Sequence, residues 1–145
     1  MKEYPLRDLT RIRNLVFLCV QNSARSQMAE ALARSMVPTE ISCWSAGSQP
    51  YHVRPQALLV LEELQIDTAG LFSKGLSDVP IDDSSLIVTL CAEEICPATP
   101  GVPALHWPIK DLAGGPTCSE EELLVRFREA RDEIKGRLEE LLSIQ

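Results

Sequence analysis

The chain has 145 residues and a mass of 16.1 kDa, which suits one domain with a sizeable core and is short for two. Its net charge of -7 argues against general binding of nucleic acid, a polyanion that most of the surface would repel. No apolar stretch approaches the roughly 20 residues that span a bilayer, and the N-terminus lacks a signal-peptide core, so we expect a cytoplasmic protein without a membrane partner.

Apolar runs alternate with helical patterns along the chain, which predicts parallel strands joined by crossover helices. The last helix has the clearest start, because the Ser119 hydroxyl and the Glu122 carboxylate fit a capping box. Residues 1–13 are predicted to be an N-terminal extension of a single domain of residues 14–145. In chain order this domain is predicted to contain a strand at 14–19, a helix at about 26–36, a strand at 41–45, a helix at about 55–65, a loop with one helical turn at 67–83, a strand at 86–90, a short strand at 104–107, a loop at 111–118 and the last helix.

Apolar residues at helical spacing predict which side of each helix is buried, and we interpret these stripes as core rather than as partner-binding faces. The stripes are Met28, Leu32 and Met36 in the first helix, Leu58, Val60, Leu61 and Leu64 in the second, and Leu123, Phe127, Ile134, Leu138 and Leu141 in the last.

The turn after the first strand carries most of the functional information. Cys19 and Arg25 are separated by five residues at the carboxyl end of a strand, where open α/β sheets place their ligands. Backbone N–H groups of the turn and of the helix N-terminus would point at an anion, and Arg25 would fork onto its oxygens. The same positive field favours Cys19 as a thiolate nucleophile. The predicted oxyanion loop consists of Cys19, Val20, Gln21, Asn22, Ser23, Ala24, Arg25 and Ser26.

Two polar side chains of this loop have predicted supporting roles. Asn22 can hydrogen-bond across the loop and hold it in an unusual backbone path. Ser26 can donate to the Cys19 sulfur, which would stabilise the thiolate and later the leaving thiolate. Phosphate and arsenate are the ligands that suit such a site.

Residues 19–31, CVQNSARSQMAEA, resemble the active-site segment of the low-molecular-weight protein tyrosine phosphatase superfamily, which includes the thiol-dependent arsenate reductases. Residues 45–48, SAGS, match a second recurrent segment of that superfamily. The resemblance extends over nearly the whole chain beyond residues 1–13. It implies a flavodoxin-like three-layer fold, with helices on both faces of a four-stranded parallel sheet and a site built by the first loop.

The other cysteines distinguish the two branches of this superfamily. A phosphatase needs water for its second step, whereas a reductase needs a second thiol that attacks the first sulfur and expels arsenite. Cys91 ends the predicted third strand, on the same sheet edge as Cys19, so that a modest loop movement could join the two sulfurs. Cys96 follows in a proline-rich segment that is typical of a mobile loop. These thiols favour reduction.

The resemblance implies a role for each of these thiols. Cys19 would be the nucleophile, Cys91 the second thiol and Cys96 the resolving thiol, which ends in a Cys91–Cys96 disulfide. Thioredoxin fits this relay as the external reductant, with no bound cofactor, while glutaredoxin with glutathione and mycothiol with its own redoxin stay open. The alternative interpretations of Cys91 and Cys96 are half of a metal site or two inert buried cysteines.

Asp111 is the predicted general acid, which would protonate the departing oxygen during thiolate attack. The alternative is an ordinary surface or capping carboxylate, since the family usually has proline where this chain has Leu112. Tyrosine phosphatases of the superfamily commonly carry adjacent tyrosines after this aspartate. Residues 113–115, Ala-Gly-Gly, follow here instead, which favours a small inorganic substrate.

Some reductases of the family bind a cation near the positions of Asn22, Ser26 and Glu30. Residues 73–75, Ser-Lys-Gly, lack the acidic residue expected at such a site, so we predict no metal. Glu30 is predicted to be a helix-surface or loop-bracing carboxylate.

The remaining candidates have predicted structural positions. His52 is expected to face solvent, and His106 and Trp107 are expected to pack at a strand end. Cys43 is expected in the core, and Cys118 is expected to be accessible to nonspecific oxidation.

The resemblance and the thiols together predict a monomeric arsenate reductase for arsenic detoxification, with phosphate as a competing oxyanion. The first alternative is a phosphatase of phosphotyrosine or of a small phosphomonoester. The second is a non-catalytic oxyanion or redox sensor.

Overall fold

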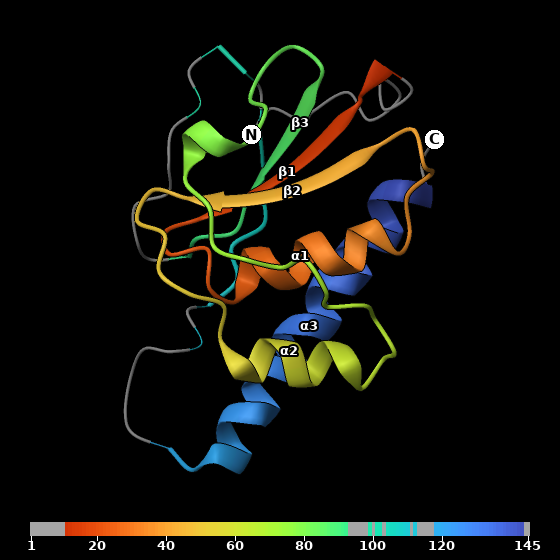
Figure 1. Ribbon diagram of the computed structural model, residues 1–145. Helices are drawn as coiled ribbons and strands as arrows, with labels where there is room; N and C mark the ends of the chain where they lie inside the picture. Colours follow the sequence, from red (N-terminus) through yellow and green to blue (C-terminus); the bar gives the residue numbers. More distant parts are fainter. Residues whose placement is uncertain are drawn as a thin grey trace.

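A four-stranded parallel sheet forms the centre of the computed structural model (Figure 1). The structure describes residues 11–92, 99, 101–102, 104–110, 112 and 118–143. All neighbouring strands pair in parallel, which confirms the predicted α/β class. The strands are β1 (Asn14–Cys19), β2 (Ser42–Gly47), β3 (Ser85–Thr89) and β4 (Ala104–His106), in the order β2-β1-β3-β4.

The strand order reverses at β1, which positions the candidate site. The chain passes from β1 to β2 on one side and returns to β3 and β4 on the other. Leu18 therefore pairs with Ala46 of β2 and with Thr89 of β3. The carboxyl ends of β1 and β3 therefore lie at a topological switch point, where open α/β sheets bind their ligands.

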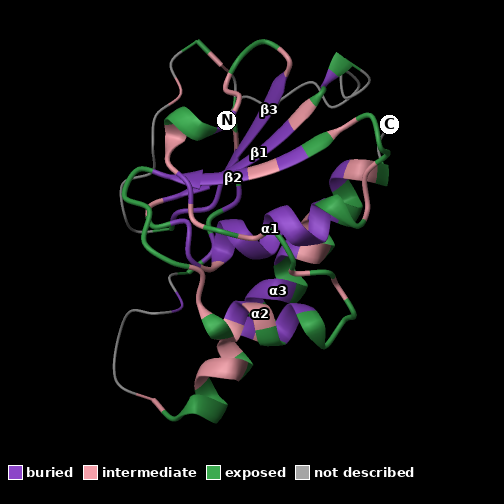
Figure 2. Ribbon diagram, in the orientation of Figure 1, coloured by how far each residue is buried: buried purple, intermediate pink, exposed green. Residues whose placement is uncertain are grey.

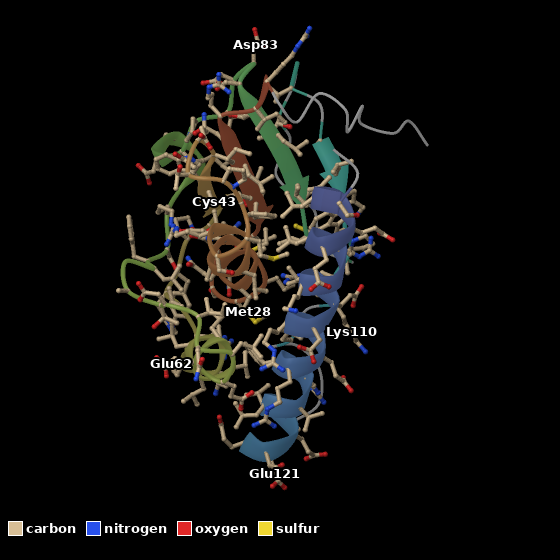
Figure 3. The ribbon with its side chains drawn as sticks, turned by 90° about the vertical axis from the view of Figure 1, so that its right-hand side faces the viewer. Met28, Cys43, Glu62, Asp83, Lys110 and Glu121 are labelled. Carbon is tan, nitrogen blue, oxygen red and sulfur yellow. The ribbon has the colours of Figure 1, made fainter. Side chains whose placement is uncertain are left out.

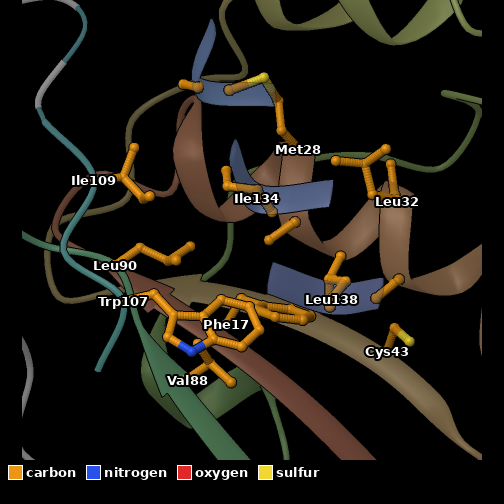
Figure 4. Packing of buried hydrophobic residues seen from close by; sticks show 14 of the residues in the cluster. Phe17, Met28, Leu32, Cys43, Val88, Leu90, Trp107, Ile109, Ile134 and Leu138 are labelled. Atoms are coloured by element: carbon orange, nitrogen blue, oxygen red, sulfur yellow. The ribbon is translucent and has the colours of Figure 1, made fainter. Parts of the chain in front are cut away.

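Three α-helices cover one face of this sheet (Figure 1). Side chains alternate along a strand, so Phe17 of β1 and Val88 of β3 point toward these helices. They pack with Ile134 and Leu138, and the Phe17 and Trp107 ring centroids lie 6.5 Å apart (Figure 4). The helices are α1 (Arg25–Arg34), α2 (Pro55–Glu62) and α3 (Glu120–Ser143).

Shorter segments cover the opposite face in the described part of the chain. Val16, Leu18 and Ile87 point to this face and pack with Val79 just after the single-turn helix η2 (Leu76–Asp78). Buried residues therefore run along both faces of the central strands and along the inner sides of the helices (Figure 2). Where the resemblance implies helices on both faces, the described residues place α-helices on one face and η2 on the other.

Several predicted boundaries differ from the structure by one or more residues, and two of these differences have a clear physical reason. β2 continues to Gly47 rather than ending at residue 45, because the small residues Ala46 and Gly47 still pair with β1. α2 ends at Glu62 rather than near residue 65, because Gln65 adopts a left-handed conformation, with φ of 60°. The Ile66 N–H then donates to the Leu61 carbonyl at 3.1 Å, as at a Schellman helix end.

The predicted buried stripes are confirmed over most of their length. Four residues of the stripes differ: Met36, Leu58 and Leu123 are only half-buried, and Leu64 lies beyond the end of α2 and is 37% exposed. Ala57, which was not predicted, is buried in the core with Val60 and Leu61. No helix in the part of the chain that the structure describes is both long and apolar enough to cross a membrane.

α3 begins with the predicted capping box. The Ser119 hydroxyl accepts a hydrogen bond from the Glu122 N–H at 3.1 Å, and the Glu122 carboxylate accepts one from the Ser119 N–H at 3.0 Å. The latter bond, followed by the hydroxyl contact, lowers the pKa of the Glu122 carboxyl below its usual 4.5. The ionised carboxylate is therefore the form that caps the helix.

We expect Ser119→Ala to lower the free energy of unfolding by about 1 kcal/mol, because the Glu122 N–H loses its acceptor. Urea denaturation measures this change, with Ser143→Ala at the exposed end of α3 as a control that stays near wild type.

A Glu122→Gln variant should be less stable than wild type at neutral pH, because it lacks the ionised carboxylate that caps the helix. This difference in the free energy of unfolding should shrink as the pH falls below 4.5, where the Glu122 carboxyl of the unfolded wild type becomes protonated.

Candidate active site

The backbone of residues 20–24 forms a loop whose carbonyl groups point outward. The carbonyls of Val20, Gln21 and Ser23 accept hydrogen bonds at 2.8, 3.1 and 2.9 Å from the backbone N–H groups of residues 49, 51 and 54. In a trans peptide the C=O and the following N–H point in opposite directions. The N–H groups that follow these three carbonyls are therefore directed into the loop, as an anion-binding nest requires.

Gly47 is needed because the oxyanion loop crosses directly over it. A Cβ atom at this position would lie 2.3 Å from the Val20 carbonyl oxygen and 2.9 Å from the Asn22 nitrogen. Both neighbours are backbone atoms, so no side-chain rotation relieves the clash. In the sequence Gly47 stands out only as part of residues 45–48, and the close approach that requires glycine is visible only in the packed structure.

Asn22 holds the loop from within, as predicted. It is fully buried and adopts φ of 52°, a left-handed conformation that asparagine tolerates better than most residues. Its side-chain amide donates to Ser26 Oγ at 2.8 Å. Its Oδ1 accepts from the Lys74 N–H at 2.8 Å and from Gln27 Nε2 at 2.9 Å. Both the nitrogen and the oxygen of the Asn22 side-chain amide are therefore held by hydrogen bonds to neighbouring residues.

Ser26 connects Asn22 to the cysteine. Ser26 Oγ lies 2.9 Å from Cys19 Sγ, at the first turn of α1. A thiolate can only accept, so when Cys19 is ionised the Ser26 hydroxyl is the donor, while Asn22 donates to the Ser26 oxygen. Cys19 itself is 2% exposed and is a free thiol at the end of β1.

Arg25 is buried and aimed toward the carboxyl ends of β3 and β4. Its Nη1 donates to the Ile109 carbonyl at 2.9 Å and lies 3.5 Å from the Leu90 carbonyl. These two carbonyl oxygens fix the orientation of the guanidinium. Arg25 is therefore a preoriented cation on the side of the loop that faces β3.

Cys91 lies just beyond β3, on the same sheet edge as Cys19. Leu18 pairs with Thr89, and the Leu90 N–H continues this pairing to the Leu18 carbonyl at 2.9 Å. Cys91 is buried and disulfide-bonded, whereas Cys19 is free. The other two predicted catalytic residues, Cys96 and Asp111, lie outside the described residues, so the structure gives them no position.

Glu30 and Lys74 form a buried ion pair beside the loop. Lys74 Nζ lies 3.3 Å from Glu30 Oε1, and both side chains are at most 5% exposed. Glu30 also accepts from the Ser45 hydroxyl at 2.5 Å and from Arg34. The possibility that Glu30 is a helix-surface carboxylate was wrong. Because an ammonium group already contacts Glu30 Oε1, these residues do not fit a bound metal cation.

The other candidates take structural positions. His52 is exposed, as expected. Trp107 is buried at the end of β4, but His106 is exposed and its Nδ1 lies 2.7 Å from the Thr89 hydroxyl. Cys43 is buried in the main core, between β2 and the helices (Figure 3), and Cys118 is half-buried.

Comparison with known proteins agrees with this geometry. The low molecular weight phosphotyrosine protein phosphatase family matches residues 14–144, and the chain belongs to this family. It is similar to an arsenate reductase of Halalkalibacterium halodurans, with 37% identity over 127 residues that cover 86% of this chain and 91% of the relative.

Two solved structures extend the similarity to three dimensions. An arsenate reductase in the phosphate binding state superposes with a TM-score of 0.74 at 27% identity and covers 92% of this chain and 100% of its own. A thioredoxin-dependent arsenate reductase of Corynebacterium glutamicum superposes with a TM-score of 0.66 at 29% identity, over 91% of this chain and 61% of its own.

We expect Gly47→Ala to weaken binding of inorganic phosphate by at least about tenfold, because the loop backbone must move to admit the methyl group. Isothermal titration with phosphate measures the change. Gly136→Ala is the matched control, since an added Cβ there has no neighbour within 4 Å and a helical alanine is favoured by roughly 1 kcal/mol. Unchanged phosphate affinity in Gly47→Ala would contradict the close approach.

Cys43 should react more slowly than Cys118 in the folded protein. Burial raises the pKa of the Cys43 thiol to about 12, although Arg34 partly opposes this, so only about one molecule in 10⁴ carries the thiolate at pH 8. Brief treatment with iodoacetamide followed by peptide mass spectrometry should find label on Cys118 first, and on both residues in urea.

Because the Cys43 thiol holds its proton more tightly in the folded state, ionisation of this group opposes folding only at high pH. The contribution of Cys43 to the free energy of unfolding should therefore be constant below pH 9 and should decline as the pH rises toward 12.

Proposed function

We propose that this chain is an arsenate reductase that converts arsenate to arsenite through a relay of its own thiols. The observation that carries the proposal is the position of Cys91, at the strand end beside Cys19 and the oxyanion loop. The names of the relatives from H. halodurans and C. glutamicum support the same activity. A phosphatase would need the loop but no second thiol at this place.

The first step uses the groups around Cys19. The loop N–H groups and Arg25 hold the arsenate oxygens, and the Cys19 thiolate attacks arsenic. The Ser26 hydroxyl, 2.9 Å from the Cys19 sulfur, is placed to donate to it during the attack. A hydroxyl group leaves as water after protonation, and we assign that proton to Asp111 as general acid. Arsenic is still in its oxidised state and is now bound to sulfur.

The second step transfers two electrons. The Cys91 thiolate attacks the Cys19 sulfur, the sulfur–arsenic bond breaks, and its electron pair stays on arsenic, which leaves as arsenite. Cys19 and Cys91 are then joined by a disulfide. Cys96 attacks Cys91, which releases the Cys19 thiolate and leaves a Cys91–Cys96 disulfide. A disulfide-bonded Cys91 together with a free Cys19 is compatible with a cycle that returns Cys19 as a thiol.

The cycle closes when an external dithiol reduces that disulfide. We propose thioredoxin as this donor, on the name of the C. glutamicum structure, with no cofactor bound to the chain. We also propose that the activity belongs to one domain of residues 14–145, with residues 1–13 as an extension, acting as a cytoplasmic monomer. Phosphate is the competing oxyanion, as the phosphate-bound relative suggests.

We expect Cys91→Ser to bind arsenate but to lose multiple turnover, because no thiol then attacks Cys19. The assay measures arsenite released from arsenate with thioredoxin, thioredoxin reductase and NADPH. Turnover should fall to background in Cys91→Ser and stay at the wild-type rate in the control Cys118→Ser. A Cys91→Ser enzyme that reduced arsenate at the native rate would rule out the relay.

An aryl phosphate assay run in parallel separates the phosphatase. Hydrolysis of an aryl phosphate that survives in Cys91→Ser, without arsenite production in the wild type, would identify a phosphatase instead. Peptide mapping after one equivalent of arsenate then identifies which sulfurs are joined.

A further inference from the structure

Lys74 is a buried cation that the proposed reaction does not use. Its side chain is 5% exposed, and its Nζ donates to the Phe72 carbonyl at 2.9 Å and to Glu30 Oε1 at 3.3 Å. The Phe72 ring lies over the ammonium, with Nζ 4.4 Å from the ring centroid. Burying an ammonium is costly unless it is paired and hydrogen-bonded, so these contacts fix its position.

One carboxylate oxygen of Glu30 contacts this ammonium, and the other contacts Arg34. Oε1 accepts from Lys74 and from the Ser45 hydroxyl, and Oε2 accepts from Arg34. Arg34 is half exposed, whereas Lys74 is not, so Lys74 supplies the buried positive charge. The oxygen atoms around Nζ are of the kind that a hard cation binds.

The same segment holds the oxyanion loop. The Lys74 backbone N–H donates to Asn22 Oδ1 at 2.8 Å, and the Ser73 hydroxyl donates to the Asn22 carbonyl at 2.8 Å. Asn22 then donates to Ser26, which contacts Cys19. A continuous set of contacts therefore leads from the buried ammonium to the reactive sulfur.

We propose that the Lys74 ammonium is a built-in monovalent cation, which anchors residues 72–74 on Glu30 and thereby positions Asn22 and the oxyanion loop. Lys74 is a positioning residue, since its ammonium contacts Glu30 and the Phe72 carbonyl while its backbone N–H holds Asn22. This inference shares with the proposed function only the assumption that the loop binds an oxyanion. Its test measures phosphate binding, which does not require the chain to reduce arsenate.

The test compares Lys74→Ala with wild type by titration of inorganic phosphate in potassium, ammonium or choline chloride at equal ionic strength. Wild type should bind phosphate equally in all three salts, because its cation is covalently attached. Lys74→Ala should bind about tenfold more weakly in choline chloride, and to within about threefold of wild type in potassium or ammonium chloride, which fill the vacated space.

Lys74→Met separates charge from shape, because it keeps the length of the side chain without the charge. It should bind phosphate weakly in all three salts, since its thioether fills the space that an ion would take. Lys135→Met, at an exposed lysine of α3, is the matched control and should bind as wild type does.

Three results would overturn the proposal: wild-type affinity of Lys74→Ala in choline chloride, wild-type affinity of Lys74→Met, or weak binding by Lys74→Ala in every salt. If Lys74→Ala does not fold in choline chloride, thermal melting replaces titration. Recovery of a folded transition in potassium chloride then supports the proposal, and its absence in every salt overturns it. A chain that passes this test but releases no arsenite would refute the proposed function alone.

Discussion

The parallel pairing of β1 with both neighbours is the constraint on which the site depends. On one side it places Gly47 beside Cys19, so that the loop after β1 lies against the segment after β2. On the other side it places Leu90 beside the end of β1, and hence Cys91 on the same edge. The loop backbone of residues 20–24 and Cys91 are thus positioned by the same sheet, and a register shift in β1 would separate both from Cys19.

Asn22 links this sheet edge to the rest of the support. A left-handed residue in a loop is unfavourable unless its surroundings fix it, and Asn22 has contacts to Ser26, Gln27 and Lys74. The loop is therefore held both by its own Ser26 and by Lys74, which is 52 positions from Asn22 in sequence. Such preorganisation suits a site that must bind a charged oxyanion without rearranging its own dipoles.

Local patterns predicted the strands, the capping box and the Cys19–Arg25 loop, because each depends on residues close together in sequence. The contact between Lys74 and Glu30 joins residues 44 positions apart, and no periodicity encodes it. The clash that makes glycine necessary at Gly47 likewise depends on how two loops cross. The short α2 reflects one left-handed residue, which the apolar spacing did not signal.

The last turn of α3 lies away from the oxyanion loop. In Figure 1 its last turn lies near the amino ends of β1 and β2, while the oxyanion loop follows their carboxyl ends. A tag, a surface linker or a fused fluorescent domain attached after α3 would therefore lie at the opposite end of these strands from the oxyanion loop. Immobilisation through the end of α3 would leave the oxyanion loop directed away from the support, which suits this fold to surface-based binding measurements.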